Sequence, residues 1–140
     1  MVYDTPMRYL GIDYGTKRVG VAVSDEDGTL AFPYAILDNS VKIISEIATV
    51  CAKEHIGKIV VGESMDFKGH ANPVMEEIER LVAGLRESTG LVVVLEREFL
   101  TTQQARYFQP GKERVDDSAA AIILQSYLDK VNVKSMADNI

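Results

Sequence analysis

The sequence predicts an α/β fold in which a mixed five-stranded sheet, a three-strand antiparallel meander plus two parallel strands, is flanked by helices. Two observations support this. Three strand-like runs separated by short turns fill residues 8–36. Beyond them, helical apolar repeats alternate with short apolar runs at 58–62 and 91–95, and such alternation indicates right-handed parallel crossovers.

The predicted meander consists of strands at 8–13, 19–24 and 29–36, with a turn at 25–28. Asp13 ends the first strand, and Gly15 follows it in a tight turn. Gly15 also leaves room beside Asp13, where a side chain would crowd an approaching ligand. Pro33 cannot donate to a strand ladder, so we expect the third strand at a sheet edge or with a bulge.

The next segment reads as a helix followed by a buried strand. Residues 38–40 supply N-cap candidates, and Gly57 is the expected C-terminal cap. The run 58–62 lacks alternation, which is typical of a strand buried on both faces, so we place it centrally and parallel to the first strand. The expected buried face of the helix is Ile44, Ile47, Ala48 and Cys51.

The second half should hold two long helices around the fifth strand. Asn72 and Pro73 open the first of these, and its inward residues are Val74, Ile78, Leu81, Val82 and Leu85. After the strand at 91–95 we expect a short helix from Thr101 or Thr102 to about Phe108, then a polar loop at 109–114. Asp116 or Asp117 caps the last helix, with a core face of Ala120, Ile123, Leu124, Tyr127 and Leu128.

Composition favours one domain over residues 1–140, with 131–140 as a frayed polar tail. The chain is 46% hydrophobic, which suffices for a sizeable core, and it shows no signal peptide or membrane-spanning run. We therefore expect a soluble cytoplasmic protein that does not bind membranes. The single cysteine, Cys51, excludes an internal disulfide and a cysteine-based metal site.

Charge narrows the function classes. The net charge of −6 argues against broad electrostatic adhesion to nucleic acid, which needs clustered Lys and Arg. Acids that converge on one site would instead hold divalent cations, and the metal would then set the local field.

Three acids from distant parts of the chain are predicted to meet. Asp13 ends the first strand, Glu98 follows the fifth, and Asp116 begins the last helix; the carboxyl ends of parallel strands share one rim. Crowded carboxylates require a neutralising cation, and oxygen ligands suit Mg²⁺ or Mn²⁺. Two such ions would clamp the attacking water and the leaving oxygen of a phosphodiester.

Each acid also has a purely structural interpretation. Asp13 is a common turn residue, and Asp116 and Asp117 are ordinary helix caps. The three glutamates near strand ends are candidates for solvated charges: Glu63, Glu96 and Glu98. Only their shared rim makes the acids informative as a set.

Residues 11–24, Gly-Ile-Asp-Tyr-Gly-Thr-Lys-Arg-Val-Gly-Val-Ala-Val-Ser, resemble the N-terminal motif of the YqgF/RuvX family. These ribonuclease-H-like proteins are described as Holliday junction resolvases or as nucleases that mature the 5′ end of pre-16S rRNA. Segments 61–69, 98–102 and 115–128 resemble further family motifs in the same order. The resemblance covers nearly the whole chain and implies a ribonuclease-H-like fold.

The resemblance implies that Asp13, Glu98 and Asp116 are the catalytic and metal-binding acids. It also implies that the cofactor is Mg²⁺ or Mn²⁺, bound as two ions. Asp117 ranks second, because the family usually has a non-acidic residue there, and Glu63 is a further candidate ligand. The chain departs from the family pattern at Glu63, Ser64, Arg97 and Phe99. Phe99 replaces an Arg and so removes a phosphate contact.

The substrate should be RNA, specifically pre-rRNA, or branched DNA, and ribosomal particles are expected partners. Tyr14 is a candidate for stacking on a base, although packing on the fold is the commoner outcome for such a residue. Either a monomer or a homodimer is compatible with the sequence. Six basic residues are expected near the rim, where together they could contact successive phosphates: Lys17, Arg18, Lys68, His70, Lys112 and Arg114. Each of them alone is more often a solvated surface charge.

Three functions therefore remain. The first is a metal-dependent nuclease that processes the 5′ end of pre-16S rRNA, with Holliday junction resolution as its alternative. The second is a non-catalytic RNA-binding factor for ribosome assembly, which the departures at Ser64 and Phe99 favour. The third is an ATP-binding protein, because Gly-Ile-Asp-x-Gly-Thr also opens the actin, hexokinase and Hsp70-like folds; it ranks low without a second phosphate loop.

Overall fold

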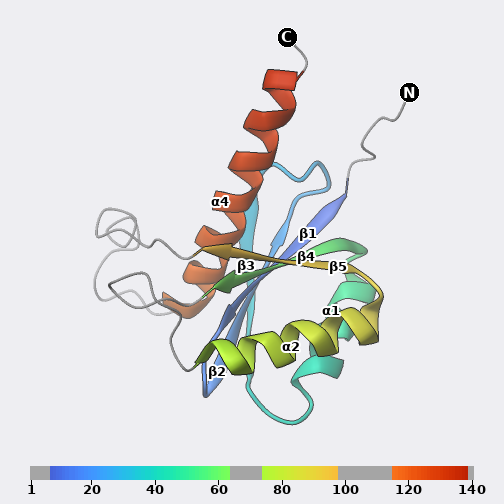
Figure 1. Ribbon diagram of the computed structural model, residues 1–140, viewed down its shortest axis with the longest axis vertical. Coiled ribbons are helices and arrows are strands. Elements are labelled where there is room, and N and C mark those ends of the chain that lie inside the picture. The colour runs from blue at the N-terminus through green and yellow to red at the C-terminus, as the bar shows by residue number, and fades with distance from the viewer. Residues whose placement is uncertain (1–6, 64–73, 98–114, 139–140) are drawn as a thin grey trace.

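A computed structural model describes residues 7–63, 74–97 and 115–138, and within the last helix it describes the side chains of residues 119–132. Its sheet has the strand order β3-β2-β1-β4-β5 (Figure 1). The strands are β1 (Arg8–Tyr14), β2 (Arg18–Ser24), β3 (Ala31–Asp38), β4 (Ile56–Glu63) and β5 (Val92–Arg97). The helices are α1 (Ile43–Lys53), α2 (Val74–Thr89) and α4 (Val115–Asp138).

The pairing confirms the predicted mixed sheet. β1 pairs antiparallel with β2, which pairs antiparallel with β3, whereas β4 is parallel to both β1 and β5. β3 is an edge strand, and its register shifts between Val21 and Ala22, opposite Ala35 and Pro33. Pro33 thus lies on an edge strand and beside a bulge, as its missing N–H requires.

The start of α1 differs from the prediction. The helix begins at Ile43, and its N-cap, Lys42, makes no side-chain capping bond. Ser40 accepts a hydrogen bond from the Lys42 N–H in the preceding turn, and the Asn39 side chain bonds to the β1–β2 turn. The expected caps at 38–40 are wrong, because the helix starts beyond them and the Asn39 and Ser40 side chains bond in turns instead.

The end of α1 also differs. The C-cap is Glu54, His55 adopts the left-handed φ of 56°, and Gly57 already belongs to β4. The residue with positive φ is therefore His55, a type that tolerates this region better than most non-glycine residues. The prediction that Gly57 caps the C-terminus of α1 was wrong.

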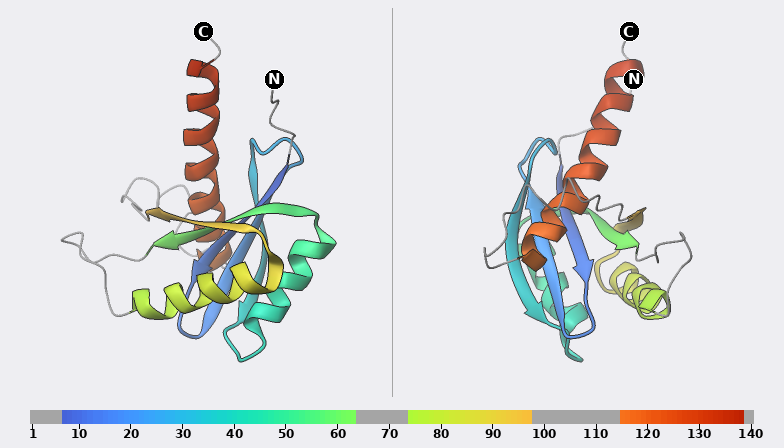
Figure 2. Two further views of the ribbon diagram at one scale, coloured as in Figure 1. Left: turned by 45° about the vertical axis from the view of Figure 1, so that its right-hand side comes forward. Right: turned by 90° about the vertical axis from the view of Figure 1, so that its left-hand side faces the viewer.

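Two cores fill the two faces of the sheet. The larger lies under α1 and α2 and includes Leu10, Ile12 and Val61. The smaller lies under α4 and includes Ala22 and Val60. Figure 2 shows the corresponding layers, with α1 and α2 on one side of the sheet and α4 on the other. Because successive strand residues point to opposite faces, β1 contributes to both cores.

The predicted helix faces are largely correct. In α2, Ile78, Leu81, Val82 and Leu85 are buried, and Met75 is buried where the half-buried Val74 was expected. In α1, Ile47 and Cys51 are buried as predicted, and Ile43 is added to them. In α4, Ala120, Ile123, Leu124 and Leu128 are buried, and Tyr127 packs beside them.

α4 continues through Asp138, whereas the sequence indicated a frayed tail from Val131 onward. The helix begins at Val115, so Asp116 and Asp117 lie in its first turn rather than at the N-cap. Three further expectations lie outside the described residues: the Asn72–Pro73 helix start, the short helix at 101–108 and the loop at 109–114. No helix among the described residues is long and apolar enough to span a membrane.

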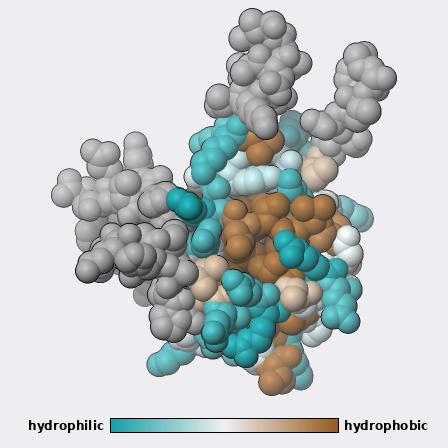
Figure 3. All heavy atoms as spheres, in the orientation of Figure 1, coloured by the Kyte–Doolittle hydropathy of each residue, from teal (hydrophilic) through white to brown (hydrophobic). Residues whose placement is uncertain are grey.

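β5 is the other edge strand of the described sheet. Its side chains Val92 and Leu95 are 60% and 41% exposed. Figure 3 shows a hydrophobic area over β5, in the middle of the face seen in Figure 1. α4 packs mainly on β1, β2 and β3, so β5 is the less covered edge.

Gly11 sets the distance between β1 and α4. A Cβ at this position would lie 2.7 Å from Leu124 Cβ and 3.0 Å from the Ala120 carbonyl oxygen. Both atoms belong to the body of the helix and cannot turn away. The absence of a side chain at Gly11 therefore lets α4 pack directly on the central strand.

Gly11→Ala should lower the free energy of unfolding by about 1–3 kcal/mol, because the added methyl group overpacks a closed interface. Gly57→Ala is the matched control, since the atoms nearest to its methyl group belong to the Met7 side chain, with Sδ at 3.1 Å. Urea denaturation measures both variants. Equal losses would contradict the close approach of α4 at Gly11.

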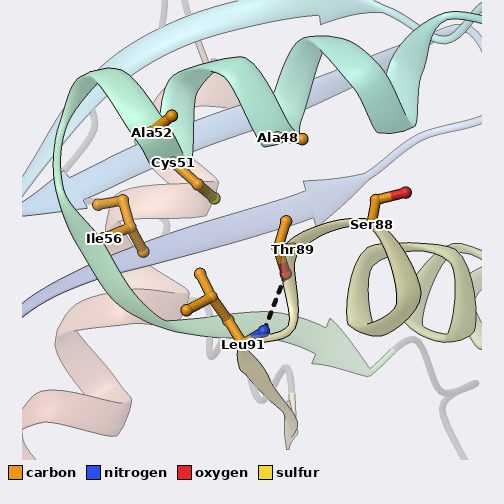
Figure 4. Close-up of a pocket in the computed structure, with 7 residues that line it drawn as sticks. All are labelled: Ala48, Cys51, Ala52, Ile56, Ser88, Thr89 and Leu91. Atoms are coloured by element: carbon orange, nitrogen blue, oxygen red, sulfur yellow. Dashed lines mark hydrogen bonds between the residues drawn. The ribbon is translucent and has the colours of Figure 1, made fainter.

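A small pocket of about 260 Å³ lies between the C-terminal ends of α1 and α2 (Figure 4). It is lined by Ala48, Cys51, Ala52, Ile56, Ser88, Thr89 and Leu91. Thr89 Oγ1 accepts the Leu91 N–H at 3.1 Å, which closes one wall. Burial raises the pKa of the Cys51 thiol from its ordinary value of 9.0 to about 11, so the thiol stays protonated at neutral pH.

Alkylation of Cys51 by iodoacetamide at pH 8 should be roughly 100-fold slower in the folded protein than in urea, because the thiolate fraction falls tenfold per pKa unit. The raised pKa also stabilises the fold only while the thiol is neutral. Its contribution is complete below the unfolded pKa of 9.0 and is lost as the pH rises toward about 11. Equal alkylation rates in the two states would contradict the burial of Cys51.

Candidate active site

Asp13 lies near the end of the central strand, on the face covered by α4. Ile12 belongs to the core under α1 and α2, so strand alternation places Asp13 on the opposite face, with Gly11. Asp13 is paired with Gly20 of β2, and continuing the β1–β4 register by one residue places Gly62 on its other side. Asp13 is half-buried, and its two flanking positions across the sheet are therefore glycines.

α4 brings its first turn to the same place. Gly11 lies against Ala120 and Leu124, and the Tyr9 ring lies 6.0 Å from the Tyr127 ring, so α4 runs antiparallel to β1. The direction from Tyr9 to Asp13 along β1 is thus the direction toward the start of α4 (Figure 1). The first turn of α4, which contains positions 116 and 117, therefore lies toward the end of β1 that carries Asp13.

Glu96 takes a different role from the solvated charge that the sequence suggested. It is paired with Gly62, faces α4 and is only 6% exposed. Its carboxylate accepts hydrogen bonds from Lys130 Nζ at 2.8 and 3.1 Å and from Ser126 Oγ at 3.2 Å. The ion pair fastens α4 to β5. Ser126 and Lys130 are four residues apart, and that spacing was the signal for a polar helix face toward the sheet.

Two sequence-based candidates lie on the other face. Glu63 follows Gly62 in β4 and so falls on the side of α1 and α2, where its cross-strand neighbour is Arg97. Tyr14, paired with Val19, packs half-buried against the core under α1 and α2. Packing on the fold, the commoner outcome for Tyr14, is therefore what the structure shows. Strand alternation also separates Glu63 from Asp13.

Two of the predicted basic residues lie close to Asp13. Arg18 begins β2 on the face of α4, diagonal to Asp13, which corresponds to a separation of about 7–8 Å. Lys17 precedes it in the turn, and both are exposed. The other basic candidates, Lys68, His70, Lys112 and Arg114, lie outside the described residues.

Two of the predicted metal ligands have described side chains. Asp13 faces α4, and Glu63 faces α1 and α2. Among the described side chains no group of three or more His, Cys, Asp or Glu could hold a metal ion. Glu98 and the side chains of Asp116 and Asp117 lie outside this set. The donor type fits a hard cation, because the half-buried Asp13 carboxylate supplies oxygen ligands.

Lys130→Met should lower the free energy of unfolding by about 2 kcal/mol, because the buried Glu96 carboxylate loses its counter-ion. Glu96→Gln in the same chain should recover most of that loss, since the amide carries no charge. Urea denaturation of the two single variants and the double variant gives the coupling. Lys53→Met, at an exposed lysine of α1, is the control; a loss equal to that of Lys130→Met would contradict the account.

The family match and the individual relatives of this chain both point to nucleases. Residues 7–130 match the family RuvX, described as Holliday junction resolvase. A protein of Geobacillus kaustophilus is 38% identical over 88% of this chain and 98% of its own length. One from Sulfurihydrogenibium sp. is 33% identical over 94% of this chain and 97% of its own. Both carry the name "Putative pre-16S rRNA nuclease".

Solved structures of low identity share the fold. RuvC of T. thermophilus, in complex with a Holliday junction substrate, matches with a TM-score of 0.62 and 14% identity, over 89% of this chain and 94% of that one. Fowlpox virus resolvase with its Holliday junction DNA matches with a TM-score of 0.58 and 14% identity, over 89% and 99%.

Proposed function

Because the chain belongs to the RuvX family, we propose that it is a metal-dependent nuclease that hydrolyses phosphodiester bonds of structured nucleic acid. The observation that supports this most directly is the position of Asp13. Its carboxylate stands between two glycines, on the face of α4 and beside the first turn of that helix. If Asp13 served only to stabilise its turn, no acidic residues would be needed in the neighbouring first turn of α4, where Asp116 and Asp117 occur.

Asp13, Glu98 and Asp116 would hold Mg²⁺ or Mn²⁺, as two ions, with Asp117 as the further candidate from the same helical turn. Bound divalent ions would supply an activated water and stabilise the leaving oxygen of the phosphodiester. Glu63 is left out of this set, because it faces α1 and α2. Glu96 is left out because Lys130 and Ser126 already engage its carboxylate.

The chain's own cations would bind the substrate backbone. Arg18 stands diagonal to Asp13 on the same face, where its guanidinium would reach a phosphate next to the scissile one. Lys17 extends this contact to the following phosphate. Lys68, Lys112 and Arg114 would continue the path, and Tyr14 would contact a base only with the part of its ring that the core leaves exposed.

We favour 5′-end processing of pre-16S rRNA as the reaction, since relatives at 31–38% identity carry the name "Putative pre-16S rRNA nuclease". Resolution of Holliday junctions is the second candidate, supported by the family description and by two fold neighbours solved with junction DNA. A cytoplasmic protein that meets ribosomal particles fits the first reaction. A non-catalytic assembly factor of the same fold is the outcome if no divalent ion supports cleavage.

Asp13→Asn should reduce Mn²⁺-dependent cleavage by several orders of magnitude, because the metal supplies most of the catalysis. Purified protein is assayed on a labelled pre-16S leader RNA and on a four-way DNA junction, and preferential cleavage of one assigns the substrate. Asp27→Asn, the same change at an exposed residue of the β2–β3 turn, should cleave like the parent protein. Cleavage that persists in Asp13→Asn would show that this site is not responsible.

A further inference from the structure

We propose that Asn39 is a positioning residue that fixes the β1–β2 turn, residues 15–17, so that Lys17 and Arg18 bind the substrate backbone next to Asp13. This rests on the proposed function, because it assumes that these two cations contact phosphates. Asn39 itself would not touch the substrate. It lies directly after the end of β3, the edge strand of the meander.

One residue holds three successive carbonyl groups of the turn. The Asn39 Nδ2 donates to the Gly15 oxygen at 2.8 Å and to the Thr16 oxygen at 3.4 Å. The Asn39 N–H donates to the Lys17 oxygen at 2.9 Å. These bonds tie the backbone of the turn to the residue that follows β3.

The turn is folded tightly on itself. A Cβ on Gly15 would clash with the Arg18 carbonyl oxygen, so the hairpin accepts only glycine there. The sequence suggested that Gly15 leaves room for a ligand; the structure shows a local backbone reason. With Gly15 closing the turn and Asn39 bracing it from β3, the backbone that carries Lys17 and Arg18 has little freedom.

This backbone determines where the cations stand relative to Asp13. The turn begins one residue after Tyr14 and ends at Arg18, the diagonal neighbour of Asp13 across β1 and β2. Both side chains are exposed and long, so a fixed backbone lowers the entropy cost of placing their charges on phosphates. Asp38, opposite Arg18 on β3, is an exposed acid that tempers the local positive charge.

The other end of β2 offers a matched control. Asp25 accepts hydrogen bonds from the Thr29 N–H at 2.8 Å, the Thr29 hydroxyl at 2.8 Å and the Leu30 N–H at 3.2 Å. These bonds, led by that of the Thr29 N–H, lower the pKa of Asp25. This turn too is held by one side chain, but it carries acids and lies away from Lys17 and Arg18.

The test measures binding of a fluorescent RNA hairpin with a single-stranded 5′ extension by anisotropy, across a series of salt concentrations with Ca²⁺ in place of Mg²⁺. Each phosphate contact on a single strand contributes about 0.7 to the slope of log affinity against log salt. Replacing Lys17 and Arg18 together by Ala should lower the slope by about 1.4. Asn39→Ala should lower it by about 0.7–1.4, and Asp25→Ala should leave it unchanged.

A merely structural role for Asn39 gives a different result. Asn39→Ala and Asp25→Ala should lower the urea midpoint by similar amounts, because each removes side-chain bonds that brace a turn. If Asn39→Ala keeps the parental salt slope, the positioning role is overturned. It is also overturned if the Lys17 and Arg18 double variant keeps that slope, since the cations then make no phosphate contact.

Cleavage separates the two proposals. If the parent protein cleaves with Mn²⁺ while none of the variants changes the salt slope, the nuclease function stands and the role of Asn39 is wrong. If the slope falls as expected but the parent protein never cleaves, the role of Asn39 in binding stands and the nuclease function is wrong.

Discussion

The contact between Gly11 and α4 is the constraint on which the rest of the structure depends. Leu10 and Ile12 anchor β1 in the core under α1 and α2, so the residues between and after them must face α4. Because Gly11 has no side chain, Leu124 and Ala120 pack against the strand itself. That packing carries the start of α4 toward the end of β1, where Asp13 points to the same face. The alternation of β1 side chains between the two faces of the sheet therefore determines both the core packing and the position of Asp13.

Two ion pairs hold the helices in the places that this packing assigns. Arg8, at the start of β1, bonds through Nη1 to the Glu54 carboxylate at 3.0 Å and to its carbonyl oxygen, and so fixes the end of α1. On the other face, Lys130 and the buried Glu96 fasten α4 to β5. Neither pair involves Asp13, whose two flanking positions across the sheet, in β2 and β4, are glycines.

The sequence was sufficient for the order of the elements, because strand and helix periods and turn residues are local signals. It was insufficient for the position of Glu63, which was expected beside Asp13. The β1–β4 register pairs Ile12 with Val61, so Gly62 lies beside Asp13 and Glu63 turns to the other face. Glu96 was taken for a solvated charge, since its partner Lys130 is distant in the chain. The caps of α1 failed similarly, because Asn39 bonds to a turn formed much earlier in the sequence. Each error concerns a contact that only tertiary register creates.

Anomalous diffraction from crystals soaked in Mn²⁺ tests the central claim most directly. The account predicts a peak at ligand distance from the Asp13 carboxylate, about 2.0–2.2 Å, on the face of α4 and beside the first turn of that helix. The same soak of Asp13→Asn should lose that peak. A peak bound by Glu63 on the opposite face, or a peak beside α4 that persists in Asp13→Asn, would contradict it.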